Sequence, residues 1–476
     1  MNKLFLYTGL EIKRQFRRRN LLIFALVLLL SYYFIRKGIC ITSVEDGSRI
    51  SPLAVWTYGF ANMQLLIASL LSLLAGFRIF RFREFNKFLY TVLNRRLFLL
   101  NVLFSGIFPF FIFLAIHEIV AIIMLRLNGF SFDGKDQLHF LIQAGMIFSV
   151  SLLFYLTGVI AGSIKRKGRP FIVGLVIWFA LVFIIPGAVH EIQSIHNYTT
   201  AGTYNIHEND RNQTNFSQFI STLSLSTFYQ EAIENFNKRN ELPKYFWTGA
   251  WLRLLYAFIM LYIIQFRWNR FLFHGGDKSF TLLKKLHLSL KPGERLVLVS
   301  RDDQLIGQIY SALCGKTKGD KPLIKIDGKD IAKDSDLLNG RDFLYICHPD
   351  RFPGDIRTEH FVHFLAEFLR LGINDRAKIS IKLDMEKNGK IRLKNLPNNV
   401  KLDLALMILF SQMSDIYMVE DLLKHQSQPA IQTFSEESRK LIDKGHYFLY
   451  ITGNSYQQLE FADRVAYLLN DPAFST

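Results

Sequence analysis

The sequence predicts an α-helical membrane domain with six transmembrane helices, followed by a soluble α/β domain. Half of the 476 residues are hydrophobic and 44 are phenylalanine, a composition too apolar for an ordinary soluble protein. Apolar runs long enough to cross a hydrocarbon core, about 20 residues each, occur only before residue 266. From about residue 277, short apolar strands alternate with turns and helices, which is typical of a soluble α/β domain. We therefore divide the chain into 1–275 and 277–476.

Six apolar runs account for the membrane domain. The first is shorter than the others but contains no charged residue, so it is counted as a span. The runs are 21–35, 53–77, 97–125, 141–164, 171–187 and 246–265. The last two are separated by a long segment, 188–245, which we expect on the outer side of the membrane.

The formal charge of +17 is arranged as a topology signal. Basic residues gather in alternate connections between the apolar runs, within 3–19, 78–96, 165–169 and 267–270, while the longer intervening connections carry few. By the positive-inside rule both termini are cytoplasmic. A basic arm for nucleic acid is the alternative, but the clusters lie directly beside the spans, so we expect a lipid membrane and no nucleic acid as the partner.

The first residues also carry a helical pattern. Leu4, Phe5 and Leu10 alternate with basic residues such as Lys13 and Arg14, which predicts an amphipathic helix on the inner membrane surface. The alternative is a simple basic flank to the first span.

Cysteine and metal chemistry contribute little. Only Cys40, Cys314 and Cys347 are present, the first expected outside and the other two inside. This excludes a disulfide framework within the chain, and no His/Cys spacing indicates a metal site.

The connection between the second and third spans, "FRIFRFREFNKFLYTVLNRRLFLL", has an aromatic stripe. Phe82, Phe85, Phe88 and Leu89 recur at helical spacing, which predicts a helix with a buried face rather than a solvated loop. Such a segment is a candidate coupling element between a cytoplasmic domain and the spans.

This connection resembles that of the ABC-2 family of exporter permeases, in which an acidic residue begins a cytoplasmic helix that ends in arginine before a span. Glu84, Arg95 and Arg96 occupy those places. The layout is also similar, with a basic start, six spans and a long external segment before the last one. That segment contains "STLSLSTFYQEAIENF", which resembles the family's LSPS stretch, with Leu225 where proline is usual.

Three ionisable residues lie within the apolar runs, where charge is costly and often functional. His117 and Glu118 fall late in an outward-running span, and Arg253 falls early in the last, inward-running span. All three are therefore expected at similar depth near the outer side. An ion pair between Glu118 and Arg253 is one hypothesis, and separate extension of each side chain to the outer interface is the other.

The soluble half resembles the ATPase domain of ABC transporters. Its opening, "LLKKLHLSLKPGERLVLVSRDDQLIGQIYSALCG", reads as a strand, a turn, a second buried strand, a loop and a helix. "LIKIDGKDI" and the closing "YFLYITGNSYQQLEFADRVAYLLN" are similar to later stretches of that family. The resemblance covers nearly all of 277–476 and implies an α/β P-loop ATPase-like fold.

The phosphate-binding loop of this family is degenerate here. A working loop needs a lysine for the outer phosphates and a Ser or Thr hydroxyl for magnesium. In the stretch that starts at Ser300, Ile306 stands in the lysine place and Gly307 in the hydroxyl place. Asp302 and Asp303 stand in the turn, where they are expected to occupy the place of phosphate at the helix N-terminus. ATP should therefore bind poorly.

The remaining stations of the family are altered as well. Two acidic residues stand at the place of the family's acidic pair, in the reverse of its usual order. We interpret them as an ordinary cap at the end of a strand in preference to a magnesium site. The family's LSGGQ signature falls at Leu396, Pro397, Asn398, Asn399 and Val400, its magnesium-sensing Gln near His348, its switch His at Gly453, and its acidic pair at Glu420 and Asp421.

Together these patterns predict a membrane subunit of an ABC exporter that has no catalytic residues and binds no cofactor itself. A separate active ABC ATPase would bind ATP and Mg²⁺, and a second permease chain or a second copy would complete the spans. The resemblance implies the bacterial inner membrane. The alternative is a non-transporting assembly or regulatory protein that uses the degenerate domain as a binding module. An active ATPase with unusual site residues is a third hypothesis.

Overall fold

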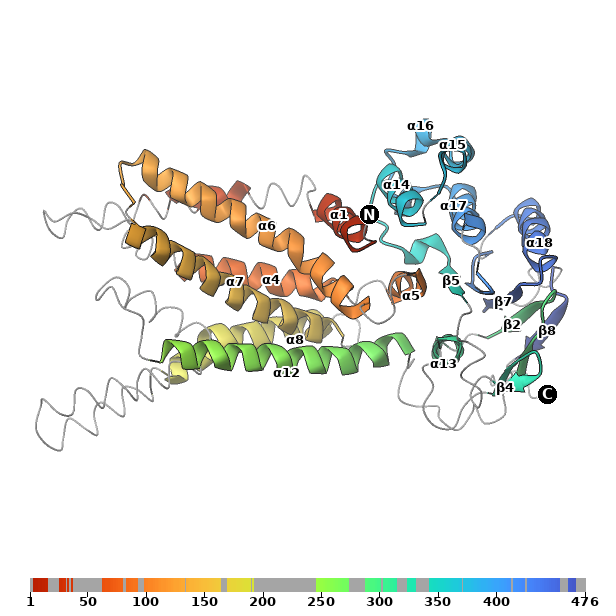
Figure 1. Cartoon of the computed structure of the whole chain (residues 1–476), viewed down its shortest axis with the longest axis horizontal. Helices are drawn as coiled ribbons and strands as arrows, with labels where there is room; N and C mark the ends of the chain where they lie inside the picture. The colour runs from red at the N-terminus through yellow and green to blue at the C-terminus, as the bar shows by residue number, and fades with distance from the viewer. Residues whose placement is uncertain are drawn as a thin grey trace, which may run out of the picture. The chain divides into compact units, whose positions relative to one another are not determined.

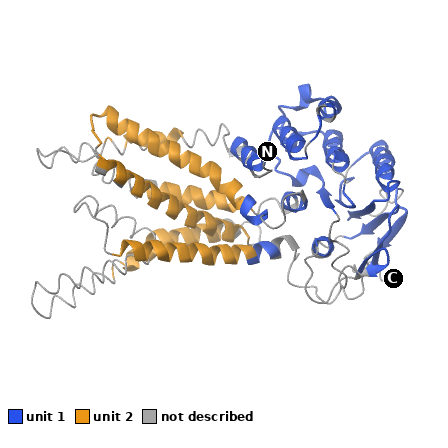
Figure 2. Cartoon of the chain, viewed as in Figure 1, with its two compact units in different colours: residues 1–14, 82–101, 266–476 blue, residues 15–81, 102–265 orange. Residues whose placement is uncertain are grey.

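The computed structural model describes residues 3–15, 25–30, 32–33, 36, 62–79, 83–92, 98–132, 134–163, 169–189, 191, 245–273, 287–300, 303–314, 323–330, 342–369, 371–411, 414–423, 426–453 and 461–467. Among the described residues, the first half of the chain contains helices, and the second contains strands with flanking helices (Figure 1). The chain divides into two compact units, shown in blue and orange in Figure 2. Unit 1 comprises Met1–Arg14, Phe82–Asn101 and Phe266–Thr476, and unit 2 comprises Gln15–Arg81 and Val102–Gln265.

Unit 2 is helical. Its described elements are α4 (Asn62–Phe77), most of α6 (Phe98–Leu127), α7 (Gly134–Gly162), α8 (Arg169–Phe179), the π-helix η3 (Ala180–Ile184) and most of α12 (Phe246–Phe273).

Four helices in the described part of the chain are long and apolar enough to cross a membrane. They are Phe98–Leu127, Asp136–Gly162, Ile172–Val189 and Phe246–Asn269, and they match the third to sixth predicted spans. The second predicted span is described only from residue 62 and contains the shorter apolar helix Leu65–Phe77. The first predicted span is described only at residues 25–30 and 32–33, so a total of six spans stays a prediction.

The helices α4 and α7 pack with their backbones in contact. A Cβ atom built at Gly158 of α7 would overlap the carbonyl oxygen of Leu73, and one built at Gly76 of α4 would overlap that of Tyr155. Small residues allow this close approach, which replaces hydrophobic driving force between helices in a membrane. Trp178 of α8 adds a hydrogen bond, donated from Nε1 to the Ser69 hydroxyl at 2.9 Å.

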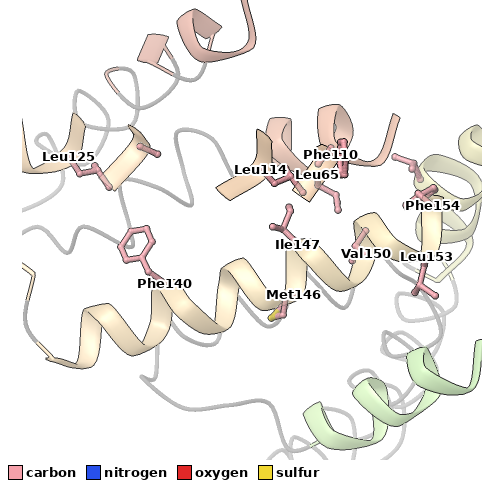
Figure 3. Packing of buried hydrophobic residues seen from close by; sticks show 13 residues of the cluster. Leu65, Phe110, Leu114, Leu125, Phe140, Met146, Ile147, Val150, Leu153 and Phe154 are labelled. Atoms are coloured by element: carbon pink, nitrogen blue, oxygen red, sulfur yellow. The ribbon is translucent and has the colours of Figure 1, made fainter. Parts of the chain in front are cut away.

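An apolar cluster joins α4, α6 and α7 (Figure 3). Phe140, Ile147 and Val150 contribute from α7, and Leu114 and Leu125 from α6.

The outer face of α12 is different, because its large apolar side chains are exposed. Trp247, Trp251, Phe258, Tyr262 and Phe266 are among them. Exposed apolar surface of this extent is characteristic of contact with lipid or with another chain.

Unit 1 is built on a five-stranded sheet with the order β5-β6-β7-β2-β8, in which every neighbouring pair is parallel. Three of the five strands, β5, β6 and β7, are buried along their whole length, as expected for a parallel sheet covered on both faces. The strands are β2 (Arg295–Val299), β5 (Phe343–Cys347), β6 (Ile416–Glu420), β7 (Tyr447–Thr452) and β8 (Arg464–Tyr467). A smaller sheet contains β1 (His287–Leu290), β3 (Leu323–Ile326) and β4 (Lys329–Asp330).

Helices accompany the sheet. They are α13 (Asp303–Leu313), the 3-10 turn η6 (Pro349–Arg351), α14 (Thr358–Phe368), α15 (Ile373–Lys382), α16 (Met385–Asn388), the 3-10 turn η7 (Leu393–Asn395), α17 (Asn398–Ser411) and α18 (Gln428–Ile442). The same unit takes in α1 (Lys3–Gln15) and α5 (Arg83–Val92), two helices from the first half of the chain. The architecture of the second half is compatible with an α/β ATPase-like domain.

Candidate functional site at the edge of the sheet

Four of the strands in unit 1 end at one edge, because neighbouring parallel strands bring their carboxyl ends together. The residues that follow β2, β5, β6 and β7 are Ser300, His348, Asp421 and Gly453. The register agrees, with Cys347 opposite Glu420 and Glu420 opposite Ile451. The backbone N–H of Ser300 donates to the Thr452 carbonyl at 2.9 Å. Residues that lie up to about 150 positions apart in the sequence therefore meet at a single edge of the sheet.

The loop after β2 leads into α13, which begins at Asp303. Ser300 is buried before the loop, and Ile306 and Gly307 are buried within the helix. The residue in the lysine place is thus part of the apolar interior. Asp302 and the side chain of Asp303 lie outside the described part, so their occupation of the phosphate place stays a prediction.

Other side chains contact both members of the acidic pair, Glu420 and Asp421, at the end of β6. Glu420 is 2% exposed, and it accepts hydrogen bonds from the Tyr345 hydroxyl and from Nη1 of Arg351. Nη2 of Arg351 lies 3.5 Å from Oδ2 of Asp421. Charge-assisted hydrogen bonds of this kind are the stronger class in proteins. One guanidinium therefore contacts both carboxylates.

Asp421 is also fixed through its backbone. Its φ of 50° lies in the left-handed region, which Asp tolerates better than most residues. Its N–H donates to the Ile451 carbonyl at 2.9 Å, and its Oδ1 accepts from the Gly453 N–H at 3.1 Å. Gly453, in the place of the switch His, therefore binds Asp421 through its backbone N–H. Among the described residues, no three His, Cys, Asp or Glu side chains gather as metal ligands.

Arg351 is a site residue that the sequence analysis missed. It lies in η6, directly after β5, in the stretch "ICHPDRF". A lone arginine in a loop carries no motif of its own. The available signal was its position after a buried strand that neighbours the strand bearing the acidic pair, and this neighbourhood is visible only once the strand order is known.

His348 caps the same turn. Its Nδ1 accepts from the Asp350 N–H at 3.3 Å, and Oδ1 of Asp350 lies 2.7 Å from the Lys401 ammonium. Burial lowers the pKa of His348, against the opposing effect of the Asp350 charge. The imidazole is therefore held in its neutral form.

The signature place lies at the start of α17. Leu396 is buried, whereas Pro397, Asn398 and Asn399 are exposed. The Pro397 carbonyl accepts from the Lys401 N–H at 3.0 Å, and the Asn398 carbonyl accepts from Nε2 of Gln426 at 3.2 Å. The backbone here is committed to forming the first turn of the helix.

The segment predicted to couple the two halves forms α5, and its aromatic face is buried within unit 1. The Phe85 ring centroid lies 5.5 Å from that of Phe352 and 6.0 Å from that of Phe361. Phe88 contacts Phe352 at 6.0 Å and Phe368 at 6.5 Å. Aromatic pairs at these separations add to the stabilisation from burial.

The three residues on which the permease resemblance rested are less completely defined. Glu84 lies in the first turn of α5, but its side chain is not among those described, and Arg95 and Arg96 lie outside the described residues. Their role in coupling stays a prediction.

Lys87 of α5 is a second residue that the sequence analysis missed. It is 1% exposed, and its ammonium lies 5.4 Å from the ring centroid of Tyr310 and 5.1 Å from that of Tyr345. The Tyr310 hydroxyl donates to the Lys87 carbonyl oxygen at 3.0 Å. A lysine in a basic segment normally indicates exposure, so nothing in the local sequence predicts this burial.

The helix α1 packs on the same part of unit 1. Tyr7 contacts Phe85 of α5 and Phe364 of α14 at centroid distances of 6.4 and 6.3 Å. Phe5, on another face, is 66% exposed. The amphipathic pattern thus forms a helix with a protein-facing side, and its expected place on the membrane surface stays a prediction.

In unit 2, the three ionisable residues of the predicted spans have local partners. Nδ1 of His117 lies 3.9 Å from Oε1 of Glu118. Arg253 is 6% exposed and donates from Nη1 to the Gly249 carbonyl at 2.6 Å. The ion pair between Glu118 and Arg253 stays a prediction.

Comparisons with known proteins give a limited result. No family model matches the sequence. No curated protein matches it either. Among solved structures, the chain is similar to the ATP-binding subunit of an ABC transporter, with 15% identity, coverage of 41% of this chain and 83% of that one, and a TM-score of 0.32. It is also similar to a structure of the archaeal ribosome recycling factor aABCE1 in complex with the archaeal ribosomal stalk protein aP1, with 12% identity, coverage of 41% and 42%, and a TM-score of 0.32.

Proposed function

We propose that this chain is a membrane subunit of an ABC exporter, with a permease-like set of spans and a catalytically inactive ATPase-like domain. A single observation carries the inactivity, namely that Arg351 engages both Glu420 and Asp421. In an active site the corresponding carboxylates serve Mg²⁺ and the attacking water. Here a side chain of the same protein occupies them.

Arg351 opposes the binding of a metal at this place. Its guanidinium would repel a divalent cation about 4 Å away by about 8 kcal/mol at an effective dielectric constant near 20, which offsets about half of the attraction that the two carboxylates would exert at the same distance. Displacement of Arg351 would leave the buried Glu420 without its cation, which is itself costly. The apolar Ile306 in the lysine place removes the usual contact with the outer phosphates.

The domain retains a clear structural role in this proposal. It binds α5 through a buried aromatic face and thereby connects the sheet to the segment between the second and third predicted spans. A separate active ABC ATPase would bind ATP and Mg²⁺ and would dock on this domain. A second permease chain, or a second copy of this one, would complete the translocation path.

The proposed location is the inner membrane of a bacterium, with both termini in the cytoplasm. Four membrane-length helices among the described residues and the alternation of basic connections support a multi-pass protein.

Purification of the chain from its native membrane in mild detergent tests the proposal, followed by mass spectrometric identification of stoichiometric partners. An ATPase with an intact phosphate-binding loop and signature is the expected partner. Its absence, with envelope machinery in its place, would contradict the exporter function and favour the non-transporting alternative. Magnesium-dependent hydrolysis by the isolated chain would contradict the inactivity.

A further inference from the structure

The burial of the Lys87 charge costs free energy, and contacts with neighbouring side chains offset this cost. Lys87 as a residue is 1% exposed, so its ammonium group has lost nearly all of its hydration. Such burial is unfavourable unless other groups compensate the charge. The compensation recorded around Lys87 includes two tyrosine rings, those of Tyr310 and Tyr345. Cation–π attraction is strongest when the cation is desolvated in this manner.

The two tyrosines have different second contacts. The second contact of Tyr310 is with α5 itself, because its hydroxyl donates to the Lys87 carbonyl oxygen. The second contact of Tyr345 is outside α5, because its hydroxyl donates to the buried carboxylate of Glu420. A phenol that donates to a carboxylate gains electron density in its ring, and this strengthens the attraction for a cation over the ring face. A continuous chain of contacts therefore runs from Lys87 through Tyr345 to Glu420 and Arg351.

We infer that Lys87 is a positioning residue that fastens α5 to the acidic pair. The carboxylate that would serve a magnesium ion in an active ATPase serves here as the anchor of the coupling segment. This rests on the proposed function, in which no nucleotide competes for Glu420. Because every group in the chain of contacts is a fixed side chain, α5 is held equally firmly with and without ATP.

Hydrogen–deuterium exchange on the full chain in lipid nanodiscs tests this inference. The rate of amide exchange in α5 reports how often the helix leaves its site. Lys87→Met keeps the length of the side chain and removes the charge, Lys87→Arg keeps the charge, and Tyr345→Phe keeps the ring but removes the hydroxyl. Lys378→Met, at an exposed lysine of α15, is the matched control.

We expect Lys87→Met to accelerate exchange in α5 about tenfold, with exchange in β6 and β7 unchanged. Lys87→Arg should preserve most of the protection, and Lys378→Met all of it. Tyr345→Phe should also accelerate exchange in α5. The double variant Lys87→Met with Tyr345→Phe should add little to either single change, because both interrupt one chain of contacts.

Unchanged exchange in α5 of a folded Lys87→Met variant would overturn the positioning role. Acceleration by Lys87→Met without any acceleration by Tyr345→Phe would overturn the connection to Glu420. Should Lys87→Met fail to fold, Tyr345→Phe alone decides, because it retains the ring and all apolar contacts.

Exchange in the wild-type chain with and without Mg²⁺-ATP tests the independence from nucleotide. Equal protection of α5 supports it, and a difference beyond about twofold overturns it. These readouts concern exchange within this chain, so they stand even where no ATPase partner co-purifies. A failure of the exporter function and a failure of the Lys87 inference are thus separate results.

Discussion

Arg351 illustrates how one side chain changes the chemistry available at a site. Its guanidinium has five N–H donors in a planar fork, and in this protein it contacts Glu420 on one side and Asp421 on the other. Glu420 also accepts from Tyr345, so each of its two carboxylate oxygens has a donor. An acidic pair at the end of a buried strand is therefore not by itself a metal site.

Replacement of Arg351 tests the structural importance of this contact. Arg351→Ala leaves the buried Glu420 without its cation and should destabilise unit 1 by about 2 kcal/mol, or roughly 5 °C in the midpoint of thermal unfolding. Adding Glu420→Gln should recover part of the loss, because a neutral amide is less costly to bury. Arg376→Ala, which removes a partly exposed pair with Glu367, is the control and should cost less than about 1 kcal/mol. Equal effects of the two arginine variants, measured by circular dichroism, would count against the account.

His348 gives the site a dependence on pH. Burial lowers its pKa in the folded protein, so the unfolded chain binds the proton first as the pH falls. The stability contributed by the neutral imidazole is fully present above about pH 6.5, the unfolded value, and is lost as the pH falls through the lower folded value. His348→Gln should therefore flatten the decline in the unfolding midpoint as the pH falls below about 6.5. An unchanged slope in this variant would show that His348 titrates normally.

At the level of elements, α4 and α7 depend on the absence of side chains at their crossing. Gly158→Ala introduces a Cβ atom that overlaps the backbone of α4 at Leu73, so the helices must separate and lose their close contact. Gly145→Ala lies in the same helix and has no heavy atom within 4 Å of the new Cβ. We expect Gly158→Ala to lower the yield of monodisperse protein in detergent several-fold and Gly145→Ala to be neutral, because alanine favours helix. Fluorescence-detected size-exclusion chromatography measures both, and indifference to Gly158→Ala would contradict the packing.

The helices were easier to predict from the sequence than the contacts that they make. The spacing of Phe82, Phe85, Phe88 and Leu89 predicted a helix with a buried face. Phe85, Phe88 and Leu89 are buried, and Phe82 lies outside the described residues. The burial of Lys87 was not predictable, because its partner Tyr310 lies 223 residues away in sequence. Local spacing reports which side of a helix is apolar, but it does not report what that side meets.

The same limit applies to the edge of the sheet. The stations at Ser300, His348, Glu420 and Gly453 were found from the order of strands and turns, and the parallel register brings them together. Their mutual compensation through Arg351 depends on the adjacency of β5 and β6, which are separated by four helices in the chain. Long-range pairing of this kind leaves no periodic signal in the sequence.

At the scale of the whole molecule, the proposed function gives the α/β half of the chain a structural role, in which Arg351 contacts the acidic pair. The apolar helices of unit 2 and the parallel sheet of unit 1 are both present. Exporter function needs a motor, and in this account the motor is a separate chain. The acids of this chain should then be dispensable for hydrolysis by the complex.

ATP hydrolysis by the purified complex carrying Asp421→Asn, and separately Glu420→Gln, tests this central claim most directly. Asp421→Asn retains an oxygen for the Gly453 N–H, so the variant should remain folded and bound to its partner. The account predicts a rate within about twofold of the unaltered complex. A fall of about a hundredfold or more, the size expected for loss of a catalytic base, with the complex intact, would contradict it.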